Sequence, residues 1–112
     1  MILYVLIFIV FIIFLIIFFQ SNTTKLSKST KIILYYTNNC GWCHKFLPTW
    51  EKLKINLSND YIFEEYECSN INQESCKNIS RFPTIIFTKN NKDIEYTGNR
   101  EYENILNYLK NN

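Results

Sequence analysis

Apolar and polar positions divide this chain into two parts of different character. Residues 1–19 form an unbroken apolar run of Ile, Leu, Val, Phe, Met and one Tyr, without a charged side chain. A helix of that length is roughly 28 Å long, close to the thickness of the hydrocarbon core of a bilayer. The pattern therefore predicts a transmembrane anchor at 1–19, a polar juxtamembrane linker at 20–30 and a folded domain at 31–112.

Two other interpretations of the apolar run fit the sequence less well. A secretory signal peptide has a basic segment, an apolar core of about 7–15 residues and a cleavage site with small residues. Here no Lys or Arg precedes the run, and Phe18-Phe19-Gln20 offers no small residue. A buried core helix would carry a polar face, which the run lacks. We therefore expect an uncleaved, single-pass anchor.

The second part of the chain alternates between short strand patterns and helical patterns. Apolar, β-branched runs predict strands, and apolar positions at three- and four-residue spacing predict helices. The predicted strands are 31–36, 61–68, 84–88 and 93–96, and the predicted helices are 40–57, 72–78 and 100–110. Because a helix joins the first two strands they should run parallel, whereas the last two should form a hairpin. The pattern predicts an α/β domain with a central mixed four-stranded sheet flanked by helices.

Charge and composition narrow the classes of function. A net charge of +2 over 112 residues is too small to indicate a nucleic-acid partner. The chain has four Cys and a single His, His44. A structural zinc site would need a second ligand pair, and Cys68 and Cys76 are too far apart for the usual C-x(2–4)-C spacing. We therefore expect no metal and no cofactor.

The motif CGWC at 40–43 lies directly after a predicted strand and opens a predicted helix, which is the usual context of a redox-active C-x-x-C pair. Free amide N–H groups and the positive end of the helix dipole would stabilise a thiolate on Cys40. Cys43, one helical turn further on, can attack a mixed disulfide formed on Cys40 and release the product. The motif predicts thiol–disulfide exchange, and a purely structural Cys40–Cys43 disulfide is the alternative.

Three motifs, in this order and at this spacing, resemble the thioredoxin superfamily and most closely its protein disulfide isomerase branch. The first is CGWCHKFLPTWEKL, in which Pro48 occupies the position of the family's helix kink. The second is Phe82-Pro83-Thr84, which precedes an apolar strand, and the third is EYTGNR at 95–100. The resemblance covers about residues 31–110 and implies a thioredoxin fold.

The resemblance also implies roles for particular residues. Cys40 resembles the attacking cysteine and Cys43 the resolving cysteine, while Pro83 resembles the cis-proline whose preceding backbone pairs with the substrate chain. Arg100 resembles the isomerase arginine that swings toward the resolving cysteine and promotes its ionisation, with a solvated residue at a helix start as the alternative. Substrate contacts are expected at the neighbouring positions Gly41, Trp42, Phe82 and Thr84.

Two further features follow from the same resemblance. Family members carry a buried acid six residues before the attacking cysteine, where it assists proton removal from the resolving thiol, and here that position is Leu34. Cys68 and Cys76 resemble a second, disulfide-bonded pair of some isomerase domains, with two unpaired thiols as the alternative. Such a bond would stabilise the domain by roughly 2–3 kcal/mol in the chain-entropy model and would indicate an oxidising compartment.

The membrane side of the domain is indicated by opposing signals. Lys25, Lys28 and Lys31 follow the apolar run, and the positive-inside rule then favours a cytosolic domain. The isomerase resemblance and the second cysteine pair favour a lumenal or extracellular domain, which is the location we expect.

The leading hypothesis is a membrane-anchored oxidoreductase that exchanges disulfides with protein substrates and depends on a redox recycling partner. The alternatives are a cytosol-facing reductase similar to thioredoxin and a non-enzymatic membrane adaptor that binds through Trp42.

Overall fold

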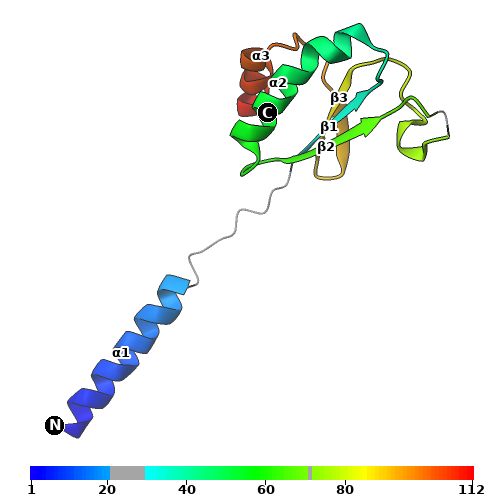
Figure 1. Cartoon of the computed structure of the whole chain (residues 1–112). Helices are drawn as coiled ribbons and strands as arrows, with labels where there is room; N and C mark the ends of the chain where they lie inside the picture. The colour runs from blue at the N-terminus through cyan, green and yellow to red at the C-terminus, as the bar shows by residue number, and fades with distance from the viewer. Residues whose placement is uncertain (21–29, 71) are drawn as a thin grey trace.

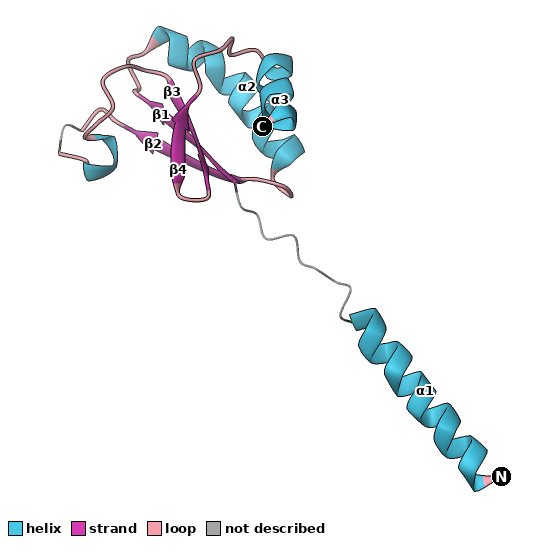
Figure 2. Ribbon diagram, turned by 180° about the vertical axis from the view of Figure 1, so that it is seen from behind, coloured by secondary structure: helices cyan, strands magenta, loops and turns pink. Residues whose placement is uncertain are grey.

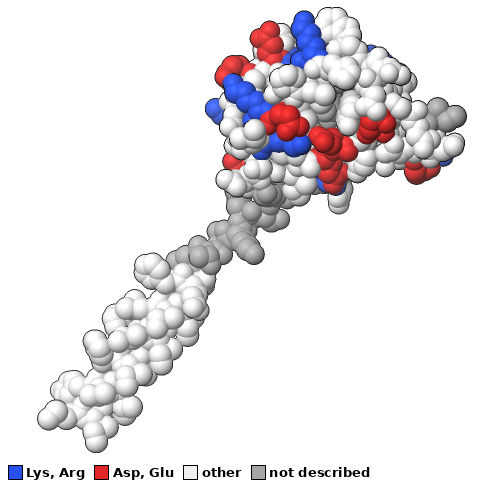
Figure 3. All heavy atoms as spheres, viewed as in Figure 1, with Lys and Arg blue, Asp and Glu red and all other residues white. Residues whose placement is uncertain are grey.

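The computed structural model describes residues 1–20, 30–70 and 72–112. Its first element is α1 (Ile2–Gln20), an apolar helix of 19 residues in which no residue is buried (Figure 1). Figure 3 shows no Lys, Arg, Asp or Glu on this helix, whereas charged side chains gather on the remainder of the chain. With a mean hydropathy of 3.6, α1 is long and apolar enough to cross a membrane.

The predicted linker lies almost wholly outside the described residues. Of its two described positions, Gln20 is the last residue of α1 and Thr30 is the first residue of the next element, a strand.

A mixed four-stranded sheet forms the centre of the domain, as predicted. Its strands are β1 (Thr30–Tyr36), β2 (Ile62–Glu67), β3 (Thr84–Lys89) and β4 (Lys92–Glu95). The spatial order is β2-β1-β3-β4, with β1 and β2 parallel and the other two pairings antiparallel. The parallel pair is connected through a helix and the β3–β4 pair through a tight hairpin, so the predicted strand directions are confirmed.

Two helices cover one face of the sheet. These are α2 (Gly41–Leu57) and α3 (Tyr102–Asn111), which lie together on the same side of the sheet in Figure 2. The core between helices and sheet contains Ile32, Leu34, Phe46, Trp50, Leu53, Ile85, Phe87, Ile105 and Leu109. The helix α2 runs unbroken through Pro48, which is exposed. The apolar positions whose spacing predicted both helices therefore form the face that each helix buries against the sheet.

The opposite face of the sheet carries a loop where a helix was predicted. The predicted helix 72–78 is wrong, because the structure has only a single 3₁₀ turn, η1 (Glu74–Cys76). Most helical stability comes from packing of an apolar face, and in this segment Cys76 is the only described residue that is buried. Cys76 packs in a small cluster with Ile33 and Tyr35 of β1.

Candidate functional site

The sequence predicted a helix that begins at Cys40. In the structure α2 begins at Gly41, and Cys40 is its N-cap. Its backbone is extended (φ −96°, ψ 112°), and its Sγ accepts a hydrogen bond from the N–H of Cys43 at 3.1 Å. The first N–H groups of a helix have no acceptor within the helix, and this sulfur is the acceptor for one of them. The same N–H groups and the helix dipole would stabilise negative charge on this sulfur.

The two cysteines of the motif differ in their access to solvent. The structure joins them in a disulfide. Cys43 is 1% exposed, whereas Cys40 is partly exposed at the start of the helix. An incoming sulfur can therefore reach Cys40 and not Cys43. This asymmetry is the arrangement expected of an attacking and a resolving cysteine.

The Phe82-Pro83 segment lies beside Cys40 although it is 42 residues away in sequence. The Phe82–Pro83 peptide bond is cis, and the Phe82 carbonyl oxygen lies 3.7 Å from the Sγ of Cys40. Pro83 and Thr84 are buried, and the Thr84 hydroxyl donates to the carbonyl oxygen of Arg81 at 2.6 Å. The structure therefore brings the first two sequence motifs together around one sulfur.

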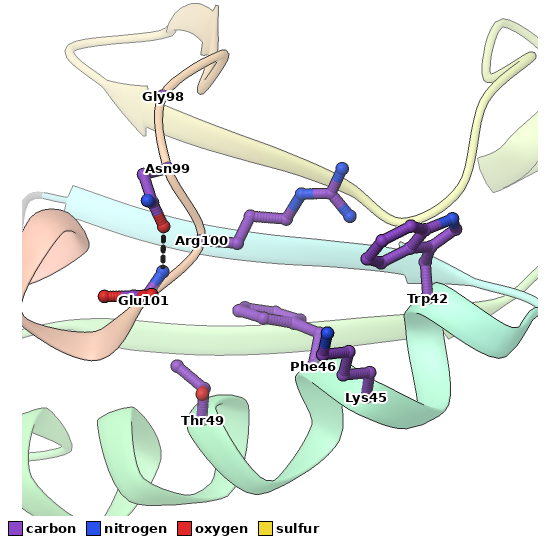
Figure 4. A pocket seen from close by; sticks show the side chains of 8 residues that line it. All are labelled: Trp42, Lys45, Phe46, Thr49, Gly98, Asn99, Arg100 and Glu101. Carbon is purple, nitrogen blue, oxygen red and sulfur yellow. Dashed lines mark hydrogen bonds between the residues drawn. The ribbon is translucent and has the colours of Figure 1, made fainter.

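The remaining predicted site residues lie around a pocket next to the motif. Gly41 is exposed and Trp42 is 67% exposed. Arg100 lies in the loop before α3, on the far side of a pocket of about 440 Å³ that Trp42 also lines. In Figure 4 its guanidinium group points toward the Trp42 ring. The structure thus places Arg100 at the rim of the site, and its predicted swing toward Cys43 stays a prediction.

A carboxylate that the sequence analysis missed holds the turn before Cys40. Glu67, at the end of β2, accepts hydrogen bonds from the N–H groups of Asn38 and Ser69, each at 3.1 Å, and from the Ser69 hydroxyl. On the other side of the turn, Nε2 of His44 lies 2.7 Å from the Asn38 carbonyl oxygen. Hydrogen bonds, first of all from the Ser69 hydroxyl, lower the pKa of Glu67 below its ordinary 4.5.

Replacing Glu67 by Gln should lower stability at neutral pH and leave it unchanged in acid. A carboxylate whose folded-state pKa is lowered stabilises the protein above its unfolded-state pKa, and this contribution disappears as the pH falls through the folded-state value. Thermal unfolding of the full chain in detergent micelles should show a lower midpoint for Glu67→Gln than for the wild type at about pH 7, well above the ordinary carboxyl range, and midpoints that converge as the pH falls toward about 3. Asp60→Asn, an exposed acid, is the control. Equal differences at both pH values would contradict the assignment.

The loop that carries Arg100 is held by two hydrogen bonds between side chains and backbone. The Tyr96 hydroxyl donates to the Asn99 carbonyl oxygen at 2.6 Å, and the Asn99 side chain accepts from the N–H of Glu101 at 2.9 Å (Figure 4). Gly98 lies so close to the Tyr96 ring that an added Cβ would be 2.7 Å from the hydroxyl oxygen. Tyr96 is itself packed against Phe87.

Gly98→Ala should therefore destabilise the protein, while Gly41→Ala should not. The tyrosine ring cannot yield without losing its packing, and overpacking of this kind typically costs about 1–3 kcal/mol. A Cβ on Gly41 would meet nothing within 4 Å, and removal of a helical glycine usually stabilises by about 0.4–1 kcal/mol. Denaturant unfolding of both variants, followed by tryptophan fluorescence, checks this contrast. Equal stability of the two variants would show that the loop relaxes freely.

The second cysteine pair lies on the opposite face of the sheet. The structure joins Cys68, just after β2, to Cys76 in η1 by a disulfide. The N–H of Cys68 also donates to the Tyr36 carbonyl oxygen at 2.7 Å, which extends the pairing of β2 with β1.

Among the described residues, no group of three or more His, Cys, Asp or Glu side chains could hold a metal ion.

Comparison with known proteins identifies the family. The model of the family described as Thioredoxin matches residues 17–111. The chain belongs to the thioredoxin family. A Trypanosoma brucei brucei protein named bloodstream-specific protein 2 is 29% identical over 93 residues, which are 81% of this chain. A protein disulfide-isomerase of Medicago sativa is 36% identical over 87 residues, 70% of this chain.

Solved structures agree with the family assignment. The first thioredoxin domain of mouse protein disulfide-isomerase A4 is 26% identical with a TM-score of 0.61, and the match covers 76% of this chain and 64% of that domain structure. The J-Trx1 fragment of ERdj5 has a TM-score of 0.67 at 18% identity, covering 76% and 43%, and so shows the fold alone. The predicted thioredoxin fold is confirmed. The chain spans only 19% of the trypanosome relative and 17% of the Medicago relative.

Proposed function

We propose that this chain is a membrane-anchored thiol–disulfide oxidoreductase that exchanges disulfides with protein substrates by oxidase or isomerase chemistry. The observation that carries the proposal is the geometry of the CGWC motif. Cys40 is accessible at a helix N-cap, Cys43 is buried one turn later, and the Phe82-Pro83 cis peptide lies beside Cys40. The family and its isomerase-type members support the same chemistry.

In the oxidising direction, a substrate thiolate attacks the Sγ of Cys40. The Cys40–Cys43 bond breaks, and Cys43 leaves as a thiolate that takes up a proton. A second substrate thiolate then attacks the mixed disulfide at the substrate sulfur and expels Cys40 as a thiolate. The substrate loses two electrons, and the cysteine pair gains them. The reverse sequence reduces or rearranges a substrate disulfide, and a recycling partner must restore the starting state.

Neighbouring residues would hold the substrate during exchange. The backbone before Pro83 would pair with an extended substrate chain, and Phe82 and Thr84 flank Pro83. The exposed Trp42 and the open position at Gly41 provide an apolar contact on the other side. Arg100 would approach Cys43 and stabilise its thiolate, which requires the side chain to leave its position at Trp42 (Figure 4).

The anchor and the compartment are part of the same proposal. A helix with the length and hydropathy of α1 supports membrane insertion, and isomerase-type relatives together with the Cys68–Cys76 disulfide support a lumenal or extracellular domain. We expect the protein to remain in the membrane pellet at full length after alkaline carbonate washing. Release into the supernatant, or a mature terminus near Ser21, would identify α1 as a cleaved signal peptide.

The decisive test measures exchange and redox potential on the full chain in detergent micelles. We expect catalysed oxidation and reduction of a fluorescent two-cysteine peptide. We also expect a reduction potential for Cys40–Cys43 near the value of about −180 mV that is typical of isomerases. A value near −270 mV, typical of thioredoxins, would favour the cytosol-facing reductase. The absence of any exchange would contradict the proposal.

The exposure of Trp42 favours one non-enzymatic alternative, a membrane adaptor that binds a partner through this side chain. Trp is enriched among the residues that contribute most to binding at protein interfaces. For an adaptor, Trp42→Ala would abolish partner binding while Cys40→Ser would leave it intact. For an oxidoreductase, Cys40→Ser would remove the covalent complex with substrate.

A further inference from the structure

The pocket beside the CGWC motif carries two cations, Lys45 and Arg100, and Lys45 has no part in the exchange reaction described above. It lies between the first turns of α2 and the loop before α3, and is lined by Trp42, Lys45, Phe46, Thr49, Gly98, Asn99, Arg100 and Glu101. Its two cations face its motif end. Lys45 has its Nζ 5.2 Å from the centroid of the Trp42 ring. Figure 4 shows the Arg100 guanidinium pointing toward the same ring and the Glu101 carboxylate directed to the opposite end.

Within residues 1–20, 30–70 and 72–112, these two cations have no carboxylate partner. Five ion pairs join side chains in the described part of the chain, and neither Lys45 nor Arg100 belongs to any of them. Both residues are exposed. Arg100 is also presented on a loop that the Tyr96–Asn99 and Asn99–Glu101 hydrogen bonds hold in place. A cation pair of this kind attracts an anion without first breaking an internal salt bridge.

We propose that this pocket selects protein substrates with an acidic side chain close to the reacting cysteine. A carboxylate would lie between Lys45 and Arg100, and the aliphatic part of its side chain would contact the Trp42 ring. Trp42 lies two residues after Cys40, in the first turn of α2, so the pocket that it lines adjoins the sulfur that a substrate attacks. An extended chain advances about 3.3 Å per residue, so the acid would stand within about three residues of the substrate cysteine.

The inference rests on the proposed exchange activity and names its substrate class. It also separates two contributions of Arg100. Stabilisation of the Cys43 thiolate would act on every substrate equally. Binding of a substrate carboxylate would act only on acidic substrates and would weaken with salt, because exposed ion pairs are screened.

The test uses the full chain in detergent micelles and three disulfide peptides that differ at one position, two residues from the cysteine: Glu, Gln or Lys. We expect kcat/KM to be roughly three- to tenfold higher for the Glu peptide than for the Gln peptide, in proportion to two exposed ion pairs, and lowest for the Lys peptide. The preference should shrink in 1 M salt, where the Debye length is about 3 Å.

Lys45→Gln should remove most of the Glu preference, so that the Glu and Gln peptides turn over at similar rates. Lys92→Gln, at an exposed lysine of β4 on the hairpin, is the matched control and should keep the preference. Arg100→Ala should reduce the preference in addition to any uniform loss. Equal rates for all three peptides on the wild-type protein would overturn the subsite, whereas no exchange with any peptide would overturn the proposed activity itself.

Discussion

Cys40→Ser is expected to reduce disulfide exchange to the uncatalysed rate, while Cys43→Ser should accumulate mixed disulfides with substrates. The difference follows from the burial of Cys43, which is 1% exposed, and from the accessible N-cap position of Cys40. Without Cys40 no sulfur of the motif is within reach of a substrate. Without Cys43 the first attack still takes place, but nothing nearby breaks the covalent complex that results.

Non-reducing gels of membranes from cells expressing each variant measure this difference. The double variant Cys40→Ser/Cys43→Ser should show no adducts. The variant Cys68→Ser/Cys76→Ser should keep exchange activity, because that disulfide lies across the sheet from the motif. Adducts on Cys40→Ser together with none on Cys43→Ser would reverse the two roles.

The arrangement of elements was predictable because each leaves a local pattern in the sequence. The hydropathy of residues 1–19 predicted α1, and short apolar runs predicted four strands to within one residue of their ends. The segment 72–78 was not predictable in this way. Its polar residues are compatible with a helix, but a helix needs an apolar face to bury, and only the folded structure shows how little of this segment is buried.

Site residues that belong to a sequence motif were predictable. Residues that join the site only through tertiary contacts were not. The C-x-x-C motif and the sequence Phe-Pro-Thr are visible in the chain, and the fold brings them together. Glu67 is one of three acids in β2, and no local signal separates it from Glu64 and Glu65. Only the parallel register, which pairs Tyr36 with Glu67, places this carboxylate beside the turn before Cys40. The resemblance of EYTGNR at 95–100 did name Arg100, but the position of this residue at the pocket depends on how the loop packs.

A second large effect is expected at Leu34, the position where family members carry a buried acid. Leu34 is fully buried on β1 and packs in the same core as Phe46 and Trp50 of α2. Cys43, the buried thiol of that helix, lies three residues before Phe46. With no carboxylate at this position, Cys43 has to lose its proton in a buried setting, which disfavours the charged thiolate. We therefore expect release of the mixed disulfide to be the slow step near neutral pH.

Leu34→Glu should lower stability by about 3–5 kcal/mol at neutral pH. Loss of the buried leucine costs about 1.5–3 kcal/mol, and burial of the carboxyl group adds a desolvation cost. Burial raises the pKa of such a carboxyl group, so the folded state binds more protons than the unfolded state and stability falls as the pH rises. Leu34→Gln is the matched control, because it has the same packing defect without an ionisable group. The two variants should be equally stable near pH 4 and diverge above it, since unfolded Glu titrates near 4.3.

The same substitution should accelerate release of the mixed disulfide. A buried carboxylate with a raised pKa accepts a proton effectively near neutral pH, and general-base assistance of this kind typically contributes about 100- to 10,000-fold in rate. Stopped-flow measurements with a fluorescent disulfide peptide separate the attack by Cys40 from the release by Cys43. We expect Leu34→Glu to speed release and leave attack unchanged, Leu34→Gln to speed neither, and Arg100→Ala to slow release more than attack on the neutral Gln peptide. If Leu34→Glu and Leu34→Gln release substrate at equal rates between about pH 6 and 8, within a unit of neutrality, then water already accepts the Cys43 proton and the missing acid does not limit the reaction.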